Sequence, residues 1–183
     1  EIHSIRPDGL DLRRHTFFDP AAVHFPLWSP DGRRLAFTEY ITAGGRTYAV
    51  DVDGPWPEPL KPFLIPPQPL DLRYRPWSWS RDGRRIAAYS QRGAGMIAYD
   101  VATGAFEPVS QVGEKPRWLS DNRRLVYAHQ GALHLIDTRT RISREIYRPP
   151  AGTITDFSVA RDDRAIIFIL QRDEGSIWIA TLE

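Results

Sequence analysis

Short apolar segments alternate with polar turns along the chain, and one such unit recurs four times. Its clearest form is Trp-Ser-Pro-Asp-Gly-Arg-Arg-Leu-Ala-Phe at 28–37, and further copies occupy 79–89, 118–127 and, in a degenerate form, 159–168. In each copy a strand ends, a polar turn follows, and a short apolar strand begins, which we expect to be buried on both faces. The turn aspartates stand 51, 39 and 41 residues apart. A period near 40 residues, built from short strands, predicts the blades of a β-propeller.

The recurring turn has a physical reason at each position. Pro30 presets φ for a turn, Asp31 can accept hydrogen bonds from the N–H groups just ahead, and Gly32 supplies a positive φ. Asn122 and Asp163 hold the glycine position in the third and fourth copies, and both residue types tolerate that conformation. The predicted structural turn residues are Asp31, Gly32, Asp82, Gly83, Asp121, Asn122 and Asp162.

The segments between these turns complete antiparallel blades of four strands. Alternating apolar strands followed by a turn recur at 47–52, 96–101 and 132–137, and 1–18 resembles the same half-blade. We therefore expect one all-β propeller domain over 1–183 and no helix, although residues 20–22 could form a single turn. Its predicted parts are a partial blade at 1–23 and blades at 24–70, 71–112, 113–152 and 153–183.

The ends of the chain can be arranged in two ways. The last blade has three predicted strands, the third at Ser176–Leu182, and the strand near 12–18 could complete it and close a four-bladed ring. The alternative, which we expect, is a fragment of a larger propeller, because half a blade and an initiator Met are missing. An isolated fragment would expose blade edges and could form a homo-oligomer through them.

The repeat at 28–37, followed by a strand such as Met-Ile-Ala-Tyr-Asp-Val-Ala-Thr-Gly at 96–104, resembles the TolB-type, WD-like propeller repeat of bacteria. The resemblance covers nearly the whole chain and implies a fold, without catalytic residues to transfer. Such propellers occur as the periplasmic protein of the Tol system and as gating domains of prolyl-oligopeptidase-like enzymes. They also occur as C-terminal sensor or interaction domains of bacterial serine/threonine kinases and winged-helix regulators, which the end of the chain, 157–183, resembles. The family slightly favours a periplasmic or other extracytoplasmic location.

Composition excludes several kinds of chemistry. A net charge of +1 gives no reason to expect nucleic acid as a partner, and the absence of cysteine excludes disulfides, thiolate nucleophiles and Cys-ligated zinc. No apolar run approaches the roughly 18 residues of a membrane span, so no membrane insertion is expected. Residues 1–20 do not read as a signal peptide. The sequence has no Gly-x-Ser-x-Gly elbow, P-loop or His-Glu-x-x-His motif. We expect no enzyme, no catalytic residue, no cofactor and no metal.

The arginine pairs that follow the turns are the first candidate binding feature. Arg34, Arg85 and Arg124 recur at one position of the repeat, so a propeller would place them around one face. They could form a basic ring for an anionic ligand or an acidic peptide. The alternative is that each arginine pairs with a turn aspartate of its own or a neighbouring blade.

Aromatic residues give the second candidate. The proline-rich stretch at 54–75 is predicted to be an extended connection, where binding loops often lie, or a loop packed on its own blade. Trp56, Tyr74 and Trp77 lie in or beside it, and Trp77 is the best candidate for an exposed binding aromatic. Trp28, Trp79 and Trp118 recur in register and are instead expected to be core wedges between blades.

Two histidines are possible metal ligands. His129 and His134 flank a hairpin and could approach each other, but two histidines without a third ligand make a poor metal site. We expect a non-catalytic propeller for interaction or sensing, with an unidentified protein or small ligand as partner, within a larger bacterial protein. The alternative is the gating domain of a prolyl-oligopeptidase-like hydrolase, or a propeller lyase.

Overall fold

The computed structural model describes residues 1–17, 22–41, 44–52, 63–64, 74–90, 93 and 95–172. Every regular element in these residues is a β-strand, and they contain no helix that could cross a membrane. The strands form antiparallel sheets of four and of two, so the all-β propeller prediction is confirmed. Trp56, most of the proline-rich stretch and the expected strand Ser176–Leu182 lie outside the described residues.

Three sheets have four strands each, paired in chain order. The first contains β3 (Ala22–Trp28), β4 (Arg34–Ile41), β5 (Gly44–Asp51) and β6 (Phe63–Leu64); the second contains β7 (Tyr74–Trp79), β8 (Arg85–Ser90), β9 (Met96–Asp100) and β10 (Phe106–Ser110). The third contains β11 (Glu114–Trp118), β12 (Arg124–His129), β13 (Ala132–Asp137) and β14 (Ser143–Tyr147). A hairpin of β1 (His3–Ser4) and β2 (Arg13–Arg14) precedes them, and β15 (Thr153–Val159) with β16 (Ile166–Gln171) follows.

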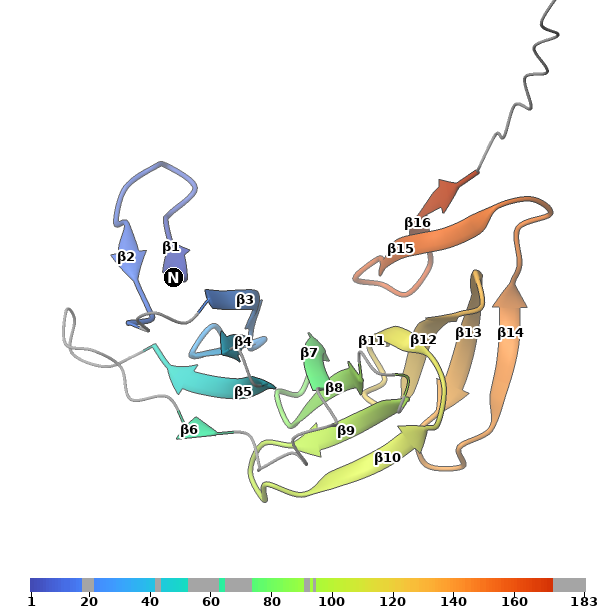
Figure 1. The fold of residues 1–183 in the computed structure, drawn as a ribbon, viewed down its shortest axis with the longest axis horizontal. Coiled ribbons are helices and arrows are strands. Elements are labelled where there is room, and N and C mark those ends of the chain that lie inside the picture. Colours follow the sequence, from blue (N-terminus) through green and yellow to red (C-terminus); the bar gives the residue numbers. More distant parts are fainter. Residues whose placement is uncertain are drawn as a thin grey trace, which may run out of the picture.

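The sheets follow one another around an arc, with β3, β7, β11 and β15 on its concave side (Figure 1). Contacts between β3 and β7, β7 and β11, and β11 and β15 join these four strands in succession. They are therefore the innermost strands of a propeller, and the axis runs past their unpaired edges.

The four recurring turns adopt one conformation, as predicted. In each, the residue at the glycine position has a left-handed φ: 72° at Gly32 and Gly83, 55° at Asn122 and 60° at Asp163. In the first turn the Gly32 N–H donates to the Ser29 carbonyl at 2.9 Å and the Arg33 N–H donates to the Asp31 carboxylate at 3.0 Å. The same two bonds recur in the other three copies. One backbone requirement, met by Gly, Asn or Asp, thus fixes the strand connection throughout.

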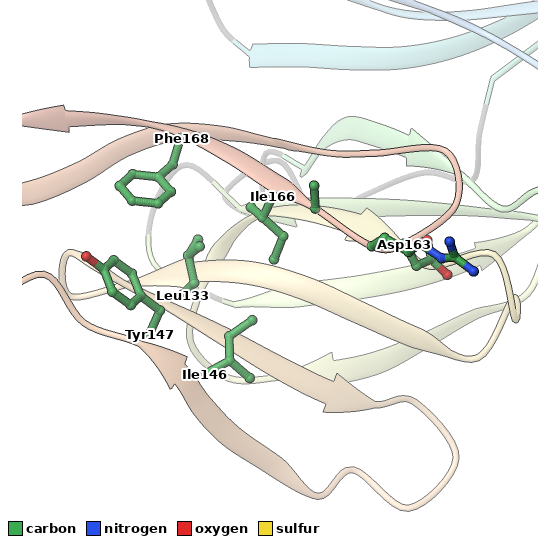
Figure 2. A pocket seen from close by; sticks show the side chains of 8 residues that line it. Leu133, Ile146, Tyr147, Asp163, Ile166 and Phe168 are labelled. Atoms are coloured by element: carbon green, nitrogen blue, oxygen red, sulfur yellow. The ribbon is translucent and has the colours of Figure 1, made fainter.

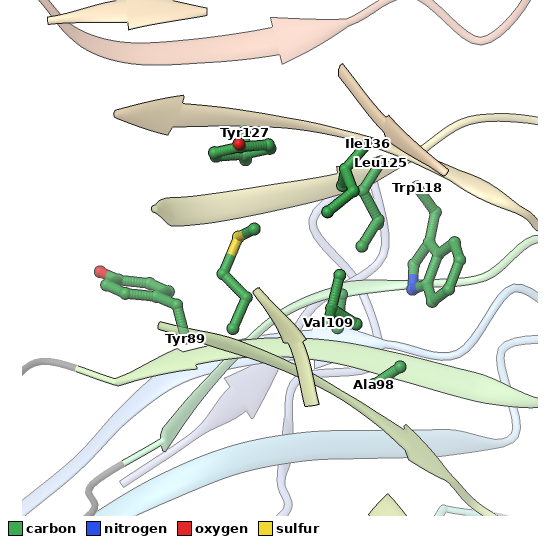
Figure 3. Close-up of a cluster of buried hydrophobic side chains, with 9 residues drawn as sticks. Tyr89, Ala98, Val109, Trp118, Leu125, Tyr127 and Ile136 are labelled. Carbon is green, nitrogen blue, oxygen red and sulfur yellow. The ribbon is translucent and has the colours of Figure 1, made fainter. Parts of the chain in front are cut away.

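Apolar side chains fill the junctions between successive sheets. Figure 3 shows the second junction, where Tyr89 and Val109 of one sheet face Trp118, Tyr127 and other residues of the next. The full cluster is Ala87, Tyr89, Met96, Ala98, Val109, Trp118, Leu125, Tyr127 and Ile136. Each junction is thus an apolar core shared by two sheets. Burying one large apolar side chain there stabilises the fold by roughly 1.5–3 kcal/mol.

Side-chain hydrogen bonds also join neighbouring sheets. The Ser78 hydroxyl on β7 donates to the Pro116 carbonyl on β11 at 2.7 Å and accepts the Trp118 N–H at 3.2 Å. Near the turns, the Asp163 carboxylate accepts the Ser120 hydroxyl at 2.6 Å and the Ser120 N–H at 2.8 Å. These bonds fix how each sheet is oriented on the previous one.

The expectation that Trp28 is a core wedge is wrong. Trp28 is 44% exposed, whereas Trp79 and Trp118 are each 8% exposed. Trp79 and Trp118 pack against a complete preceding sheet. Trp28 follows only the β1–β2 hairpin, whose His15 ring meets the indole edge-on at 5.7 Å. Its exposure follows from that missing neighbour.

The expectation that the apolar strand after each turn is buried on both faces is wrong for the fourth copy. Residues 35–37, 86–88 and 125–127 are buried, as predicted, but in the fourth copy Ile167 is 76% exposed and Ile169 61%. These two isoleucines occupy the positions that face a following sheet in the other copies, and no described residue covers them here. The β1–β2 hairpin does not complete this sheet: Ile2 packs instead against Leu35 and Phe37 of the first one.

Candidate functional site

The turn face of the arc carries the arginines predicted as a basic ring, and each has a partner. Arg34 Nε lies 2.9 Å from the Asp51 carboxylate, and Arg124 Nε lies 2.5 Å from that of Asp121. The Arg85 guanidinium carbon stands 4.6 Å from the centroid of the Trp118 ring, and the side chain donates to the Asn122 carbonyl on the next sheet. Arg124 thus pairs with a turn aspartate, as the alternative interpretation expected, whereas Arg34 pairs with an aspartate at the end of β5, and Arg85 contacts a ring and a backbone carbonyl.

Arg123 is similarly engaged on this face. It pairs with the Asp137 carboxylate, which also accepts the N–H groups of Arg139 and Thr140 at 2.9 and 3.2 Å. The hydrogen bond from Arg123 lowers the pKa of Asp137 to about 2. A carboxylate held this way is already satisfied and is poorly placed to act on a ligand.

A pocket of about 310 Å³ opens where the turns of all four repeats meet. Its lining residues are Pro30, Trp79, Arg81, Trp118, Leu119, Ser120, Val159, Ala160, Arg161 and Asp163. We call this pocket the axial mouth, because it lies at the turn ends of the innermost strands. Arg81 and Arg161 are exposed beside it, whereas Trp79 and Trp118 are buried in its floor. The axial mouth thus combines an apolar floor with two exposed cations.

Arg81 and Arg161 are not among the site residues predicted from the sequence. They occupy the same turn position as Pro30 and Ser120, next to the aspartate of the repeat. A comparison of the four turns at that position would have found them, because two copies carry a cation where the first carries proline. Which turn positions face the axis, however, follows only from the stacking of the sheets.

Tyr74 and Trp77, predicted as binding aromatics, both lie on the innermost strand β7 and are half-buried. The Trp77 ring meets Tyr89 edge-on at 5.4 Å between centroids and lies 6.3 Å from Phe25. The Thr47 hydroxyl donates to the Tyr74 carbonyl at 2.9 Å, which ties the first sheet to the second. Trp77 is therefore part of an aromatic group formed by residues of β3, β7 and β8.

His129 and His134 do approach each other across the hairpin, with ring centroids 5.7 Å apart. His134 also stacks on Tyr127 at 5.2 Å, and burial lowers its pKa. No group of three or more metal-ligating side chains occurs in the described part of the chain.

A second pocket, of about 360 Å³, lies between the third sheet and β16 (Figure 2). Leu133, Ile146 and Tyr147 form one side and Ile166 and Phe168 the other, with Tyr147 and Phe168 rings 5.3 Å apart. This second pocket is lined mostly by apolar side chains of the two facing sheets. It belongs to the packing between sheets, so the axial mouth is the better candidate for ligand binding.

Comparison with solved structures supports the propeller assignment. A TolB-like protein from Agrobacterium tumefaciens matches with a TM-score of 0.73 and 14% identity, over 90% of this chain and 60% of its own. TolB from Acinetobacter baumannii matches with a TM-score of 0.55 and 16% identity, over 80% and 42%. A puromycin hydrolase matches with 0.55 and 18% identity, over 80% and 24%. The chain is thus a β-propeller of TolB type in its fold, and it spans less than two thirds of the length of each of these proteins.

No protein-family model and no curated protein sequence matches the chain. At such low identity the structural likeness establishes the fold alone, and function has to be argued from the site.

Proposed function

We propose that this chain is a non-catalytic propeller module that binds an acidic segment of a protein partner at the axial mouth. The observation that carries the proposal is the pocket where turns from all four repeats meet, with Arg81 and Arg161 exposed beside it. Loops held by a rigid scaffold are the usual place for binding in such folds.

The chemistry of the mouth favours an anionic ligand. Asp163, the carboxylate in its lining, is turned to Ser120, from which it accepts two hydrogen bonds, and the two arginines leave the lining with an excess of positive charge. Arginine binds carboxylates through paired N–H groups, and the indoles of Trp79 and Trp118 give an apolar floor. We thus assign anion binding to Arg81 and Arg161, and no longer to the predicted Arg34, Arg85 and Arg124.

A gating domain of a hydrolase is the second candidate function. The similarity to a puromycin hydrolase favours it, although the match spans only 24% of that protein. The non-catalytic assignment is supported by the lack of a Gly-x-Ser-x-Gly elbow in this sequence. An α/β-hydrolase segment in the full-length coding sequence would assign the propeller to an enzyme, whereas a kinase or winged-helix segment would assign it to signalling.

An extracytoplasmic location accompanies the proposal because of the TolB-type likeness. No nucleic-acid partner, membrane insertion or cofactor is part of it. Association of copies through open sheet edges is compatible with binding at the mouth, because the mouth is formed by turns and not by edges.

The proposal can be tested by nuclear magnetic resonance with hexaglutamate as the probe. The chain has six tryptophans, so the indole N–H signals of Trp79 and Trp118 can be assigned by single Trp→Phe variants. Hexaglutamate should shift these two signals saturably. The variant with Arg81→Gln and Arg161→Gln should bind about tenfold more weakly, since two cations that face the ligand are lost.

Arg144→Gln is the matched control, because Arg144 is an exposed cation on the outer strand β14. It should bind hexaglutamate like the parent chain. Unchanged Trp79 and Trp118 signals, or equal affinity of the double variant and the parent, would contradict the proposal.

A further inference from the structure

The four innermost strands share a distortion at the axis. Each contains a β-bulge where its register with the next strand shifts: at His24–Leu27 in β3, Pro76–Ser78 in β7, Glu114–Arg117 in β11 and Ile154–Asp156 in β15. Phe25 and Lys115, each three residues before the tryptophan of its repeat, also have left-handed φ angles of 59° and 56°. Bulges redirect side chains, and left-handed residues with a Cβ cost energy, so both concentrate at functional sites.

The redirected side chains bring cations onto aromatic rings of the preceding strand. The guanidinium carbon of Arg75 lies 4.4 Å from the centroid of the Phe25 ring. That of Arg117 lies 5.4 Å from the centroid of the Trp77 ring. Lys115, also on β11, donates from Nζ to the Thr155 carbonyl on β15. The three cations thus come from two adjacent innermost strands, and we call the surface that these strands present around Arg117 the axis-facing surface.

Arg117 is the least satisfied of these cations. Its Nε is buried without a hydrogen-bond partner in the described residues, and so is Nε1 of the adjoining Trp77. Burial lowers the pKa of Arg117, and the charge of Asp156 opposes that shift. The Asp156 carboxylate is itself directed to the backbone, where it accepts the Phe157 N–H at 2.8 Å. A half-buried guanidinium with an unused donor is costly unless an anion completes it.

The four innermost strands carry two carboxylates. Glu114 is exposed at the start of β11, and Asp156 is the carboxylate on β15. Lys115 and Arg117 stand on one strand, and the Asp156 carboxylate accepts a backbone N–H, so an anion beside Arg117 would be attracted.

We propose that this axis-facing surface is a carboxylate-binding site centred on Arg117. The planar guanidinium would hold the carboxylate through two N–H groups, and Lys115 would add positive potential. The rings of Trp77 and Phe25 would contact the apolar body that carries the carboxylate. The site goes beyond the proposed function, because it lies on strands and requires neither Arg81 nor Arg161.

The bound carboxylate could belong to a small molecule or to an acidic side chain of a peptide, so the experiment has two arms. Sodium benzoate represents the first and the blocked tripeptide acetyl-Ala-Glu-Ala-amide the second. Each is titrated into the nitrogen-15-labelled chain while the Trp77 indole and Arg117 Nε–H signals are followed, with sodium chloride of matched ionic strength as the blank. Arg117→Lys keeps the charge and removes the planar fork. Arg144→Gln removes a cation from the outer strand β14.

A saturable shift of the Trp77 and Arg117 signals by either probe, weakened about tenfold in Arg117→Lys and unchanged in Arg144→Gln, is the expected result. The probe that binds identifies the source. Shifts no larger than those in sodium chloride, or equal affinity in Arg117→Lys, would overturn the proposal. Thermal unfolding of the variant checks that it is folded. Because the proposed function is read from Trp79 and Trp118, either proposal can fail without the other.

Discussion

The side-chain oxygen of Asn122 accepts the backbone N–H of Asp82 at 3.1 Å and so joins the turns of two successive sheets. Asn122 stands where the first two repeats carry glycine, and its φ of 55° is left-handed. A residue that satisfies its own turn thus also reaches the neighbouring one. Asp163 of the fourth copy does the same toward Ser120 of the third.

Replacing Asn122 should separate these two roles. Asn122→Gly keeps the left-handed turn and loses the bond to Asp82, which should cost about 0.5–1.5 kcal/mol of unfolding free energy. Asn122→Ala loses the bond and adds roughly 1–2 kcal/mol of backbone strain. Urea unfolding followed by tryptophan fluorescence measures both. If Asn122→Gly is as stable as the parent chain, the bond between the turns contributes nothing.

The three tryptophans of the repeat should differ in energetic weight. Trp79→Ala and Trp118→Ala should each cost about 3–5 kcal/mol, because both indoles fill a junction between sheets. Trp28→Ala should cost clearly less, since 44% of Trp28 is exposed. Where an alanine variant does not fold, the corresponding Trp→Phe variant keeps the comparison possible. Equal losses at all three positions would show that Trp28 is buried in solution.

Stability should fall as the pH is lowered from 8 to 5. Burial lowers the pKa of both His15 and His134 below the ordinary 6.5, so the unfolded chain binds protons that the folded chain does not. The stabilisation is complete above 6.5 and is lost as the pH falls toward the lowered values. The variant with His15→Gln and His134→Gln should show a flatter dependence of the urea midpoint on pH.

His24→Gln, a change at an exposed histidine that does not contribute to the lowered pKa of His15 or His134, is the control for that series and should keep the slope of the parent. A double variant with the slope of the parent would mean that neither buried ring governs the effect.

Two glycines with similar backbone angles should respond differently to alanine. Gly83 and Gly95 have φ of 72° and 79°, but a Cβ on Gly83 meets nothing within 4 Å, whereas one on Gly95 would stand 2.0 Å from the Ser110 carbonyl oxygen. Gly83→Ala should cost roughly 1–2 kcal/mol, the strain of a left-handed residue. Gly95→Ala should cost more, because β9 and β10 would have to separate. Thermal unfolding of both variants measures the two losses of stability. Equal losses would exclude the clash.

The turns could be predicted from the sequence because each depends on few, local requirements. The glycine position of the repeat, together with their residue types, predicts a left-handed conformation for Asn122 and Asp163, and both are found there. Trp28 could not be placed in this way. Its burial depends on the sheet before it, and only the hairpin packs there.

The positions of the candidate site residues could be predicted less well, because they depend on how the sheets stack. Arg34 and Arg124 were correctly placed after the turns, but their partners, Asp51 and Asp121, use up the charge that a basic ring would need. Arg117 follows a bulge, and the repeat pattern gives no sign of a bulge. Side chains that face the axis are selected by the relative rotation of blades, which sequence periodicity does not encode.

The central claim is that the four repeats gather their turns around one mouth, and a distance measurement tests it most directly. The chain has no cysteine, so Arg81→Cys and Arg161→Cys can be spin-labelled together without removing native thiols. Pulsed electron paramagnetic resonance should give one short, narrow distance, because both positions line the same 310 Å³ pocket. Labels at 81 and 144 should lie farther apart, since Arg144 is on an outer strand. A long or broad distribution for the 81–161 pair would contradict the account.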